Sequence, residues 1–255
     1  MAKGYFLERE EFLRPPLSER ELGLREVRRA GRALSGNPRD LRLFGMGVLT
    51  WYSLGIRILG RTAVEVTRDR QAAFFAGAVA GTLRREGQEI GQVVDPFLGS
   101  GNLLYHFTRC LGVRHCVGFE LDHSICDLAR ANFSRLQRVG KLRGVTFELK
   151  EADWSEAGKT VNRASSVVIL SPPWGGGFGE HGLDLRLTTP PVMSILRELS
   201  DSATGDEVFA AVHTHPWIVR ESVVEVRDSF DVLETVLPDD PAVATRIDYL
   251  LVRLR

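Results

Sequence analysis

The chain has 255 residues, 44% of them hydrophobic and 26% charged, which is typical of an ordinary globular protein and excludes a disordered or fibrous one. Its length suits one large α/β domain with an extension and is short for two full domains. The 33 basic and 33 acidic residues balance each other, so the whole chain falls well short of the basicity of a dedicated nucleic-acid binder.

The charge is nevertheless uneven, because residues 1–70 carry 14 Lys or Arg against 9 Asp or Glu. No stretch approaches the roughly 20 apolar residues of a membrane span, and the first residues are too charged for a signal peptide. We therefore expect a cytoplasmic protein. The cysteines, Cys110, Cys116 and Cys126, form neither an even disulfide set nor a C-x-x-C spacing, which predicts reduced thiols and no zinc site.

The first 60 residues lack the strand–helix alternation that follows and carry turn signals at Pro15-Pro16 and at residues 36–38 and 45–47. We interpret residues 1–60 as a basic, helical N-terminal appendage that binds substrate or acts as a lid. Ser18 and Glu21 form a capping-box pair that predicts the start of a helix here. One side of this helix is apolar, and the other carries Arg25, Arg28, Arg29 and Arg32. The arginine face is either the solvated face of a packed helix or a contact surface for a polyanion.

Residues 61–255 form the predicted main domain. Thr67 and Asp69 start a helix that ends near Gly87. Two β–turn–α units follow, a strand at 92–94 with a helix at 102–110 and a strand at 116–120 with a helix at 124–139. Gly112 and Gly140 mark the ends of these two helices.

The other strands are predicted at residues 145–149, 167–170, 208–213, 232–237 and 247–254. The run at 167–170 is continuously apolar, which predicts a strand buried on both faces. Seven strands with helices between the early ones indicate an α/β fold with a doubly wound, mostly parallel sheet. Only about ten residues separate the last two strands, too few for a crossover helix, so we expect an antiparallel pair at one end of the sheet.

Polar and glycine-rich motifs follow the first two predicted strands. Asp95 opens the sequence Asp-Pro-Phe-Leu-Gly-Ser-Gly, in which Gly99 and Gly101 let the backbone approach a ligand at a helix N-terminus. Glu120 ends the second strand, where a carboxylate can accept hydrogen bonds from ribose hydroxyls. These two motifs are shared by NAD sites and other nucleotide sites, so they do not by themselves choose the cofactor.

Two further motifs follow the third and fourth strands. Asp153 comes after the third and can accept from an adenine amine. The fourth is followed by Ser171-Pro172-Pro173-Trp174, a stiff turn that offers a hydroxyl, carbonyl oxygens and a flat indole. Such a turn fits a planar group with an in-plane NH₂, which stacks on Trp174 and donates to Ser171 and the Pro172 carbonyl.

With this motif the sequence resembles the class I S-adenosylmethionine-dependent methyltransferases that carry an (Asn/Asp/Ser)-Pro-Pro-aromatic motif. Within them it is most similar to the trimethylguanosine synthase family, the RNA cap guanine-N2 methyltransferases. The resemblance covers about residues 62–220 and rests above all on residues 167–176, with Leu183-Asp184-Leu185-Arg186 beyond them. The N-terminal appendage has no counterpart in it.

The resemblance implies that Asp95 and Gly99 hold the methionine part of the cofactor, Glu120 the ribose and Asp153 the adenine. It implies that the catalytic residues that position the acceptor are Ser171, Pro172 and Trp174. The full set expected to contact S-adenosylmethionine is Asp95, Pro96, Phe97, Gly99, Gly101, Glu120, Leu121, Asp153 and Trp154.

The function expected is N-methylation of a planar exocyclic amine such as a guanine N2 in RNA. A small-molecule N- or O-methyltransferase is the alternative, since the chain is neutral overall and the appendage could cover a pocket. A protein amide is a third possible acceptor, and a protein that senses the cofactor without transferring a methyl group is a fourth reading. The sequence alone does not decide among these acceptors and does not indicate the oligomeric state.

Several other residues invite a role that we discount. His213 and His215 alternate on a strand, but no third ligand has suitable spacing, so we predict no metal and place them in a pocket wall. Trp51 and Tyr52 are expected to pack inside the appendage or to close over an acceptor. The loop residues that either touch substrate or lie on the surface are Glu180, His181 and Asp184.

Overall fold

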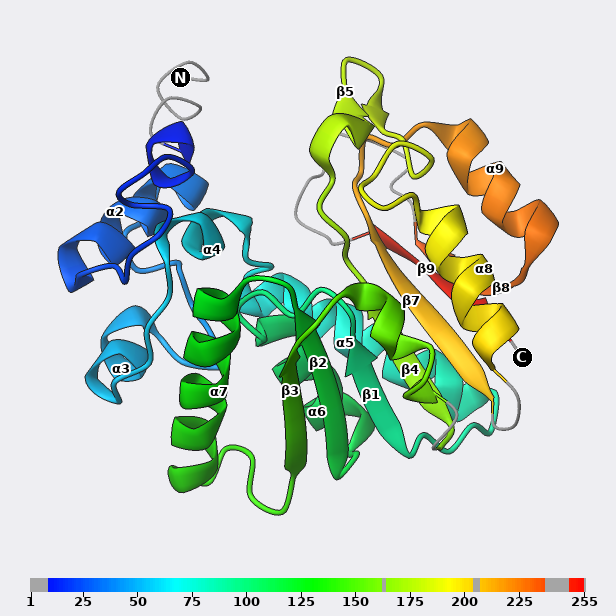
Figure 1. Ribbon diagram of the computed structural model, residues 1–255, viewed down its shortest axis with the longest axis horizontal. Coiled ribbons are helices and arrows are strands. Elements are labelled where there is room, and N and C mark those ends of the chain that lie inside the picture. Colours follow the sequence, from blue (N-terminus) through cyan, green and yellow to red (C-terminus); the bar gives the residue numbers. More distant parts are fainter. Residues whose placement is uncertain (1–8, 162–163, 204–206, 237–247, 255) are drawn as a thin grey trace.

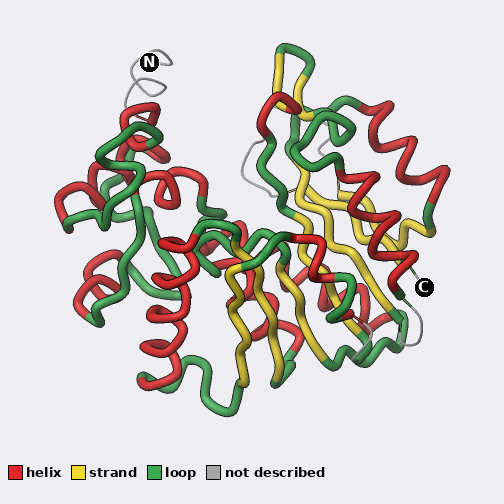
Figure 2. Tube along the Cα trace, in the orientation of Figure 1, coloured by secondary structure: helices red, strands yellow, loops and turns green. Residues whose placement is uncertain are grey.

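A computed structural model describes residues 9–161, 164–203, 207–236 and 248–254. Within these ranges seven strands form one sheet in the order β3-β2-β1-β4-β7-β9-β8 (Figures 1 and 2). The neighbours from β3 to β7 run parallel, whereas β9 is antiparallel to both β7 and β8. The expected doubly wound, mostly parallel sheet with an antiparallel pair at one end is confirmed. The strands of this sheet are β1 (Gln92–Asp95), β2 (His115–Glu120), β3 (Thr146–Glu151), β4 (Ser166–Leu170), β7 (Val208–Thr214), β8 (Asp231–Val236) and β9 (Asp248–Arg253).

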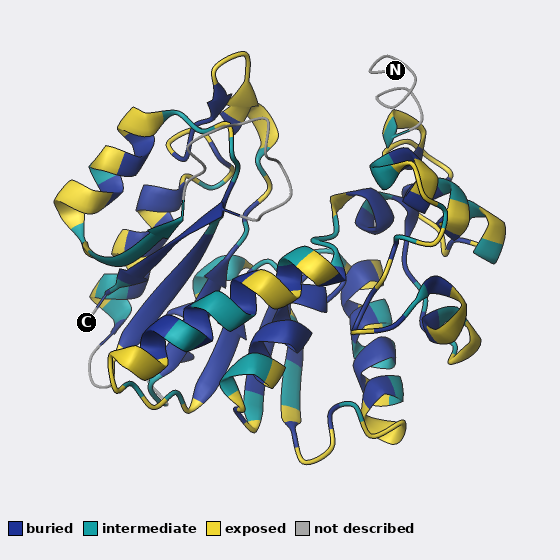
Figure 3. Cartoon of the chain, turned by 180° about the vertical axis from the view of Figure 1, so that it is seen from behind, coloured by how far each residue is buried: buried dark blue, intermediate teal, exposed yellow. Residues whose placement is uncertain are grey.

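The two faces of the sheet bury alternate residues in two different hydrophobic clusters. In β4, Val167 and Ile169 belong to one cluster, and Val168 and Leu170 belong to the other. All five residues of β4 are buried, as its continuously apolar sequence predicts for a central parallel strand. Figure 3 shows the buried strands between helices whose outer surfaces are exposed.

Three helices of the main domain pack on the face that holds Val167: α5 (Asp69–Arg85), α6 (Asn102–Leu111) and α7 (His123–Arg138). The opposite face is covered by α8 (Val192–Ser202) and α9 (Arg220–Ser229), with the short helix η1 (Trp154–Ala157). Neither α8 nor α9 was predicted from the sequence. Glycines with positive φ end α6 at Gly112 and follow α7 at Gly140, as expected.

The N-terminal segment, residues 9–68, contains α2 (Leu24–Ser35), α3 (Val48–Ser53) and α4 (Gly60–Glu65). The predicted start of α2 at Ser18 is wrong. The helix begins after Gly23, and Glu26 accepts a hydrogen bond from the Gly23 N–H at 2.8 Å, so the capping interaction lies five residues later. Ser18 is instead buried. The exposed side of α2 carries Arg25, Arg28 and Arg32, as predicted.

Two buried asparagines of the main domain hold the N-terminal segment by its backbone. Asn102, at the start of α6, accepts from the Phe44 N–H and donates to the Thr67 carbonyl, both at 2.8 Å. Asn132, on α7, accepts from the Arg57 N–H at 3.0 Å and donates to the Arg57 carbonyl at 2.7 Å. The same hydrophobic cluster also joins this segment to α6 and α7. The segment is thereby fixed beside the loops that follow β1 and β2.

None of the helices in the described ranges has the length and apolar character that a bilayer span needs.

The three cysteines are free thiols, and Cys116 and Cys126 are buried.

Candidate functional site

The sheet reverses its strand order between β1 and β4, because β1 pairs with β2 on one side and with β4 on the other. Ligands of open α/β sheets bind at the carboxyl ends of the strands beside such a point. Asp95 ends β1, and Ser171 follows the last residue of β4. In Figure 1 the N-terminal segment and the β5 hairpin rise on either side of this edge of the sheet.

Asp95 is buried with one carboxylate oxygen unsatisfied. Its side chain is 1% exposed. Oδ1 accepts from the Phe97 N–H at 3.0 Å, whereas Oδ2 has no hydrogen-bond partner. Burial raises the pKa of Asp95 to about 7; the Phe97 N–H opposes this shift and the nearby Glu120 carboxylate adds to it. A cationic group bound at Oδ2 would satisfy this atom and favour the charged form.

Glu120 connects the loops after β1 and β2. Its Oε2 accepts from the Gly99 N–H at 3.0 Å, and its Oε1 accepts from the Asp122 N–H at 2.9 Å. A carboxylate has about four lone-pair positions, so both oxygens can accept a further hydrogen bond. The next residue, Leu121, is 73% exposed, so its apolar side chain is open to a ligand.

Gly99 and Gly101, in the loop after β1, have different structural roles. Gly99 has φ +49°, and a Cβ there would meet only the Phe97 carbonyl oxygen, at 4.0 Å, so open space lies next to it. Gly101 has φ +78°, its N–H donates to the Leu98 carbonyl, and a Cβ there would lie 2.5 Å from the Phe133 ring. Gly101 therefore shapes the turn and lets α6 pack against α7.

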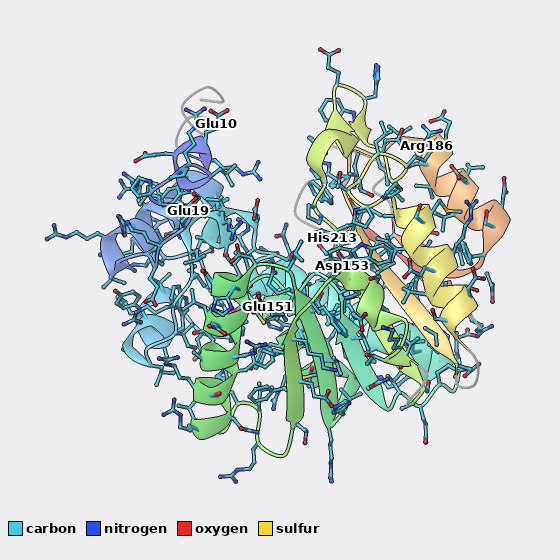
Figure 4. All side chains as sticks on the ribbon, viewed as in Figure 1. Glu10, Glu19, Glu151, Asp153, Arg186 and His213 are labelled. Atoms are coloured by element: carbon cyan, nitrogen blue, oxygen red, sulfur yellow. The ribbon has the colours of Figure 1, made fainter. Side chains whose placement is uncertain are left out.

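At the end of β3, Asp153 caps the short helix η1 by accepting from the Ser155 N–H at 3.1 Å. Its side chain is exposed, and Trp154 beside it is half-buried against the cluster under α8. Figure 4 labels Glu151, Asp153 and His213 along the carboxyl edge of the sheet.

Helix α4 adds charged residues that the sequence analysis did not single out. Arg61 forms an ion pair with Asp122, in the loop after β2. Glu65, on the same helix, is exposed; partial desolvation raises its pKa, Arg61 opposes the shift and Glu120 adds to it. A small cavity lies between this segment and the glycine loop, lined by residues that include Leu59, Thr62, Gly99 and Ser100.

Ser171 hydrogen-bonds to a histidine on the neighbouring strand. Leu170 of β4 pairs with Val212 of β7 in parallel register. The next residues of the two segments, Ser171 and His213, therefore lie side by side. Ser171 Oγ lies 3.0 Å from His213 Nδ1. Burial, with a smaller contribution from His215, lowers the pKa of His213 to about 4. The imidazole is therefore neutral at pH 7.

Trp174 belongs to an aromatic cluster at the ends of β4 and β7. Its ring stacks on Phe178 with centroids 5.5 Å apart and 17° between the planes, and it meets His215 edge-on at 5.5 Å. Phe178 also contacts Trp217 edge-on at 6.2 Å. Phe178 is 38% exposed and Trp217 48% exposed, so planar apolar surface faces outward at this edge.

In the turn that carries Trp174, Pro172 is buried and Pro173 is exposed. The Pro173 carbonyl accepts from the Thr189 N–H at 3.1 Å. No donor among the described residues bonds to the carbonyl oxygen of Pro172. Two short strands, β5 (Phe178–Gly179) and β6 (Gly182–Leu183), then form a hairpin that returns the chain.

Other residues considered from the sequence have mainly structural roles. Trp51 is fully buried and donates to the Leu41 carbonyl at 3.0 Å, so its expected packing role is confirmed. Asp184 is buried and forms two hydrogen bonds with the Arg186 guanidinium, at 2.8 and 2.6 Å, whereas Glu180 and His181 are exposed. The described residues contain no cluster of three His, Cys, Asp or Glu side chains suited to a metal ion.

Three contributors to this region were not predicted from the sequence: Arg61, Phe178 and the bond between Ser171 and His213. Phe178 has a local signal, because it is an aromatic residue only four positions after Trp174. The other two depend on which strands are neighbours and on how the N-terminal segment folds back, and no local pattern encodes either.

No protein-family model and no curated protein sequence matches the chain. Among solved structures, a candidate methyltransferase from Porphyromonas gingivalis W83 is similar with a TM-score of 0.52 and 15% identity, over 81% of this chain and 48% of that one. A candidate methyltransferase from Escherichia coli gives a TM-score of 0.43 and 15% identity, over 70% of this chain and 84% of that one. A candidate RNA methyltransferase from Pyrococcus horikoshii gives a TM-score of 0.43 and 20% identity, over 70% of this chain and 81% of that one. The sheet topology and the similarity to the structure from Porphyromonas gingivalis show a Rossmann-like fold of the kind found in methyltransferases.

Proposed function

We propose that the protein is a methyltransferase that uses S-adenosylmethionine. The observation that carries this proposal is the unsatisfied Oδ2 of buried Asp95 beside Glu120, at the point where the strand order reverses. A cation would satisfy the Oδ2 atom of Asp95, and hydroxyl donors would use the remaining lone pairs of Glu120. S-adenosylmethionine has both, in its α-ammonium group and its ribose diol.

We propose the following contacts with this cofactor. Asp95 would accept from the ammonium group, Gly99 would give the methionine part room to approach the backbone, and Glu120 would accept from the ribose hydroxyls. Leu121 would cover one face of the adenine, and Asp153 would accept from its amine. The proposed cofactor-binding set is Asp95, Pro96, Phe97, Gly99, Gly101, Glu120, Leu121, Asp153 and Trp154, with Gly101 acting through the shape of the turn.

The acceptor would lie on the β4 side of the site, where Ser171, Pro172 and Trp174 are the proposed catalytic residues. The free Pro172 carbonyl and the Ser171 hydroxyl would orient an N–H group, and Trp174 with Phe178 would stack on its ring. The bound cofactor supplies a methyl group on a sulfonium, which is a good leaving group. The protein's part is to align the acceptor nitrogen with this methyl group and to exclude water, so no strong base is needed.

We propose a nucleobase amine in RNA, such as a guanine N2, as the acceptor. The planar aromatic surface of Trp174 and Phe178 and the exposed arginines of α2 support this class. Residues 1–60 would then form the part that guides or covers the substrate, and residues 61–255 the catalytic domain. A planar small molecule is the second candidate, and the zero net charge of the chain favours it.

One experiment tests the proposal and separates the two acceptors. The purified protein is incubated with methyl-tritiated S-adenosylmethionine and with RNA, protein and small-molecule fractions of one cell extract. Label in the RNA fraction, together with RNA binding that weakens as salt rises, supports the RNA acceptor. Label in the small-molecule fraction alone supports the second candidate. No affinity for the cofactor in calorimetry would refute the proposed function.

A further inference from the structure

The hydroxyl of Ser171 has a partner that decides which way its hydrogen points. Ser171 Oγ and His213 Nδ1 are 3.0 Å apart. A hydroxyl has one hydrogen and two lone pairs. A neutral imidazole has one N–H and one unprotonated nitrogen, here called bare. Two arrangements are therefore possible. Either Ser171 donates to a bare Nδ1, or a protonated Nδ1 donates to Ser171.

We propose that His213 is a positioning residue whose bare Nδ1 accepts the Ser171 hydroxyl hydrogen, so that Ser171 presents only lone pairs to the methyl acceptor. The inference rests on the proposed function and deepens it. It restricts the substrate class, because the accepting atom must then carry a hydrogen to donate to Ser171. Amines and hydroxyl groups meet this condition, whereas tertiary amines, thioethers and bare ring nitrogens do not.

The surroundings of His213 keep its imidazole neutral and in place. The imidazole stays neutral at pH 7, because burial and His215 hold the pKa of His213 near 4. Its ring is held between two other rings, with centroid distances of 6.1 Å to Phe75 and 5.6 Å to Trp174. An imidazole confined in this way keeps Nδ1 directed at Ser171.

His215 gives an internal reference for the same chemistry. The Trp217 N–H donates to His215 Nδ1 at 3.0 Å, and a backbone N–H can only donate. The Trp217 carbonyl oxygen, which can only accept, lies further from the same nitrogen, at 3.4 Å. The shorter contact favours a bare Nδ1 at His215, with the hydrogen of the neutral ring on Nε2. The pKa of His215 is also lowered, mainly by burial, so both rings are neutral at pH 7 and their tautomers can be compared in one spectrum.

The tautomer of His213 is measured directly by long-range ¹H–¹⁵N NMR of the full chain at pH 7, labelled at its histidines and assigned with His213→Asn and His215→Asn. We expect a bare Nδ1 at both His213 and His215. In Ser171→Ala the His213 Nδ1 signal should shift away from its hydrogen-bonded position, and the His215 signal should stay. A protonated Nδ1 at His213 would overturn the proposal, and this result does not depend on any enzymatic activity.

Turnover with tritiated S-adenosylmethionine, on whichever extract fraction the wild-type protein labels, tests the consequence. Ser171→Ala and His213→Phe should each lower kcat by about tenfold to 100-fold, and the double variant should be no slower than either single one, since both remove the same oriented oxygen. His213→Asn keeps an acceptor oxygen near the place of Nδ1 and should recover most of the loss.

All of these variants should bind S-adenosylmethionine with wild-type affinity, because neither side chain lies on the β1 side of the site. Losses that multiply in the double variant, or a His213→Asn as slow as His213→Phe, would overturn the positioning role. If no fraction is labelled although the cofactor binds, the proposed transferase activity fails, whereas the tautomer result still decides the inference about His213.

Discussion

The buried carboxyl of Asp95 makes a prediction about stability that can be tested before any acceptor is known. Its pKa is raised to about 7 by burial, compared with about 3.9 in an unfolded chain. The folded protein therefore holds this proton more tightly than the unfolded chain does. The destabilisation is absent below about pH 4, grows as pH rises, and is complete above about pH 7.

The size of the effect follows from the two pKa values. A difference of about three powers of ten corresponds to about 4 kcal/mol of lost stability at pH 8. Asp95→Asn removes the charge and keeps the oxygen that accepts from Phe97. Its new NH₂ group would replace the unsatisfied Oδ2, and a buried donor without a partner costs about 1–3 kcal/mol. We expect the variant to be more stable than the wild type by about 1–3 kcal/mol at pH 8.

Urea unfolding at pH 5 and pH 8 measures this difference. The advantage of Asp95→Asn should be large at pH 8 and should shrink or reverse at pH 5, where the wild-type carboxyl is protonated. S-adenosylmethionine should raise the unfolding midpoint of the wild type much more than that of the variant, since only a carboxylate pairs with the ammonium group. A pH dependence of stability that is the same in both proteins would refute the reasoning.

Three more substitutions test other parts of the site. Trp174→Ala should abolish turnover while calorimetry finds cofactor affinity nearly unchanged; equal loss of both would contradict a stacking role for this indole. Gly101→Ala should destabilise the protein by about 3 kcal/mol in urea unfolding, because φ is +78° and the new Cβ would lie 2.5 Å from Phe133. Adding Phe133→Leu to this variant should recover part of the lost stability, and no recovery would argue against the clash. Asn132→Ala removes both hydrogen bonds to the Arg57 backbone. The free energy of unfolding should fall by about 2 kcal/mol, and amide hydrogen exchange should become faster across α4. Unchanged exchange in α4 would show that the asparagine does not hold this segment.

The amino-acid sequence alone determined the alternation of strands and helices in the centre of the chain. The strand β4 was predicted from its continuous run of apolar residues, and the end of α6 from Gly112, because burial on both faces and a left-handed glycine leave local signals. The four loops proposed to form the site were likewise predicted from polar residues at strand ends. The apolar spacing of α8, with Val192, Ile195, Leu196 and Leu199 buried, was also present in the sequence.

Only the tertiary structure decided how these elements meet. The helix α9 contains Val223, Val224 and Val226, and β-branched residues do not favour a helix by themselves, so its packing on the sheet stabilises it. Ser171 meets His213 because β4 and β7 pair in one particular register, and side chains 42 positions apart in the chain leave no periodic signal of such a pairing. Local conformation is encoded by neighbouring residues, whereas contacts between distant segments depend on the packing of the whole sheet.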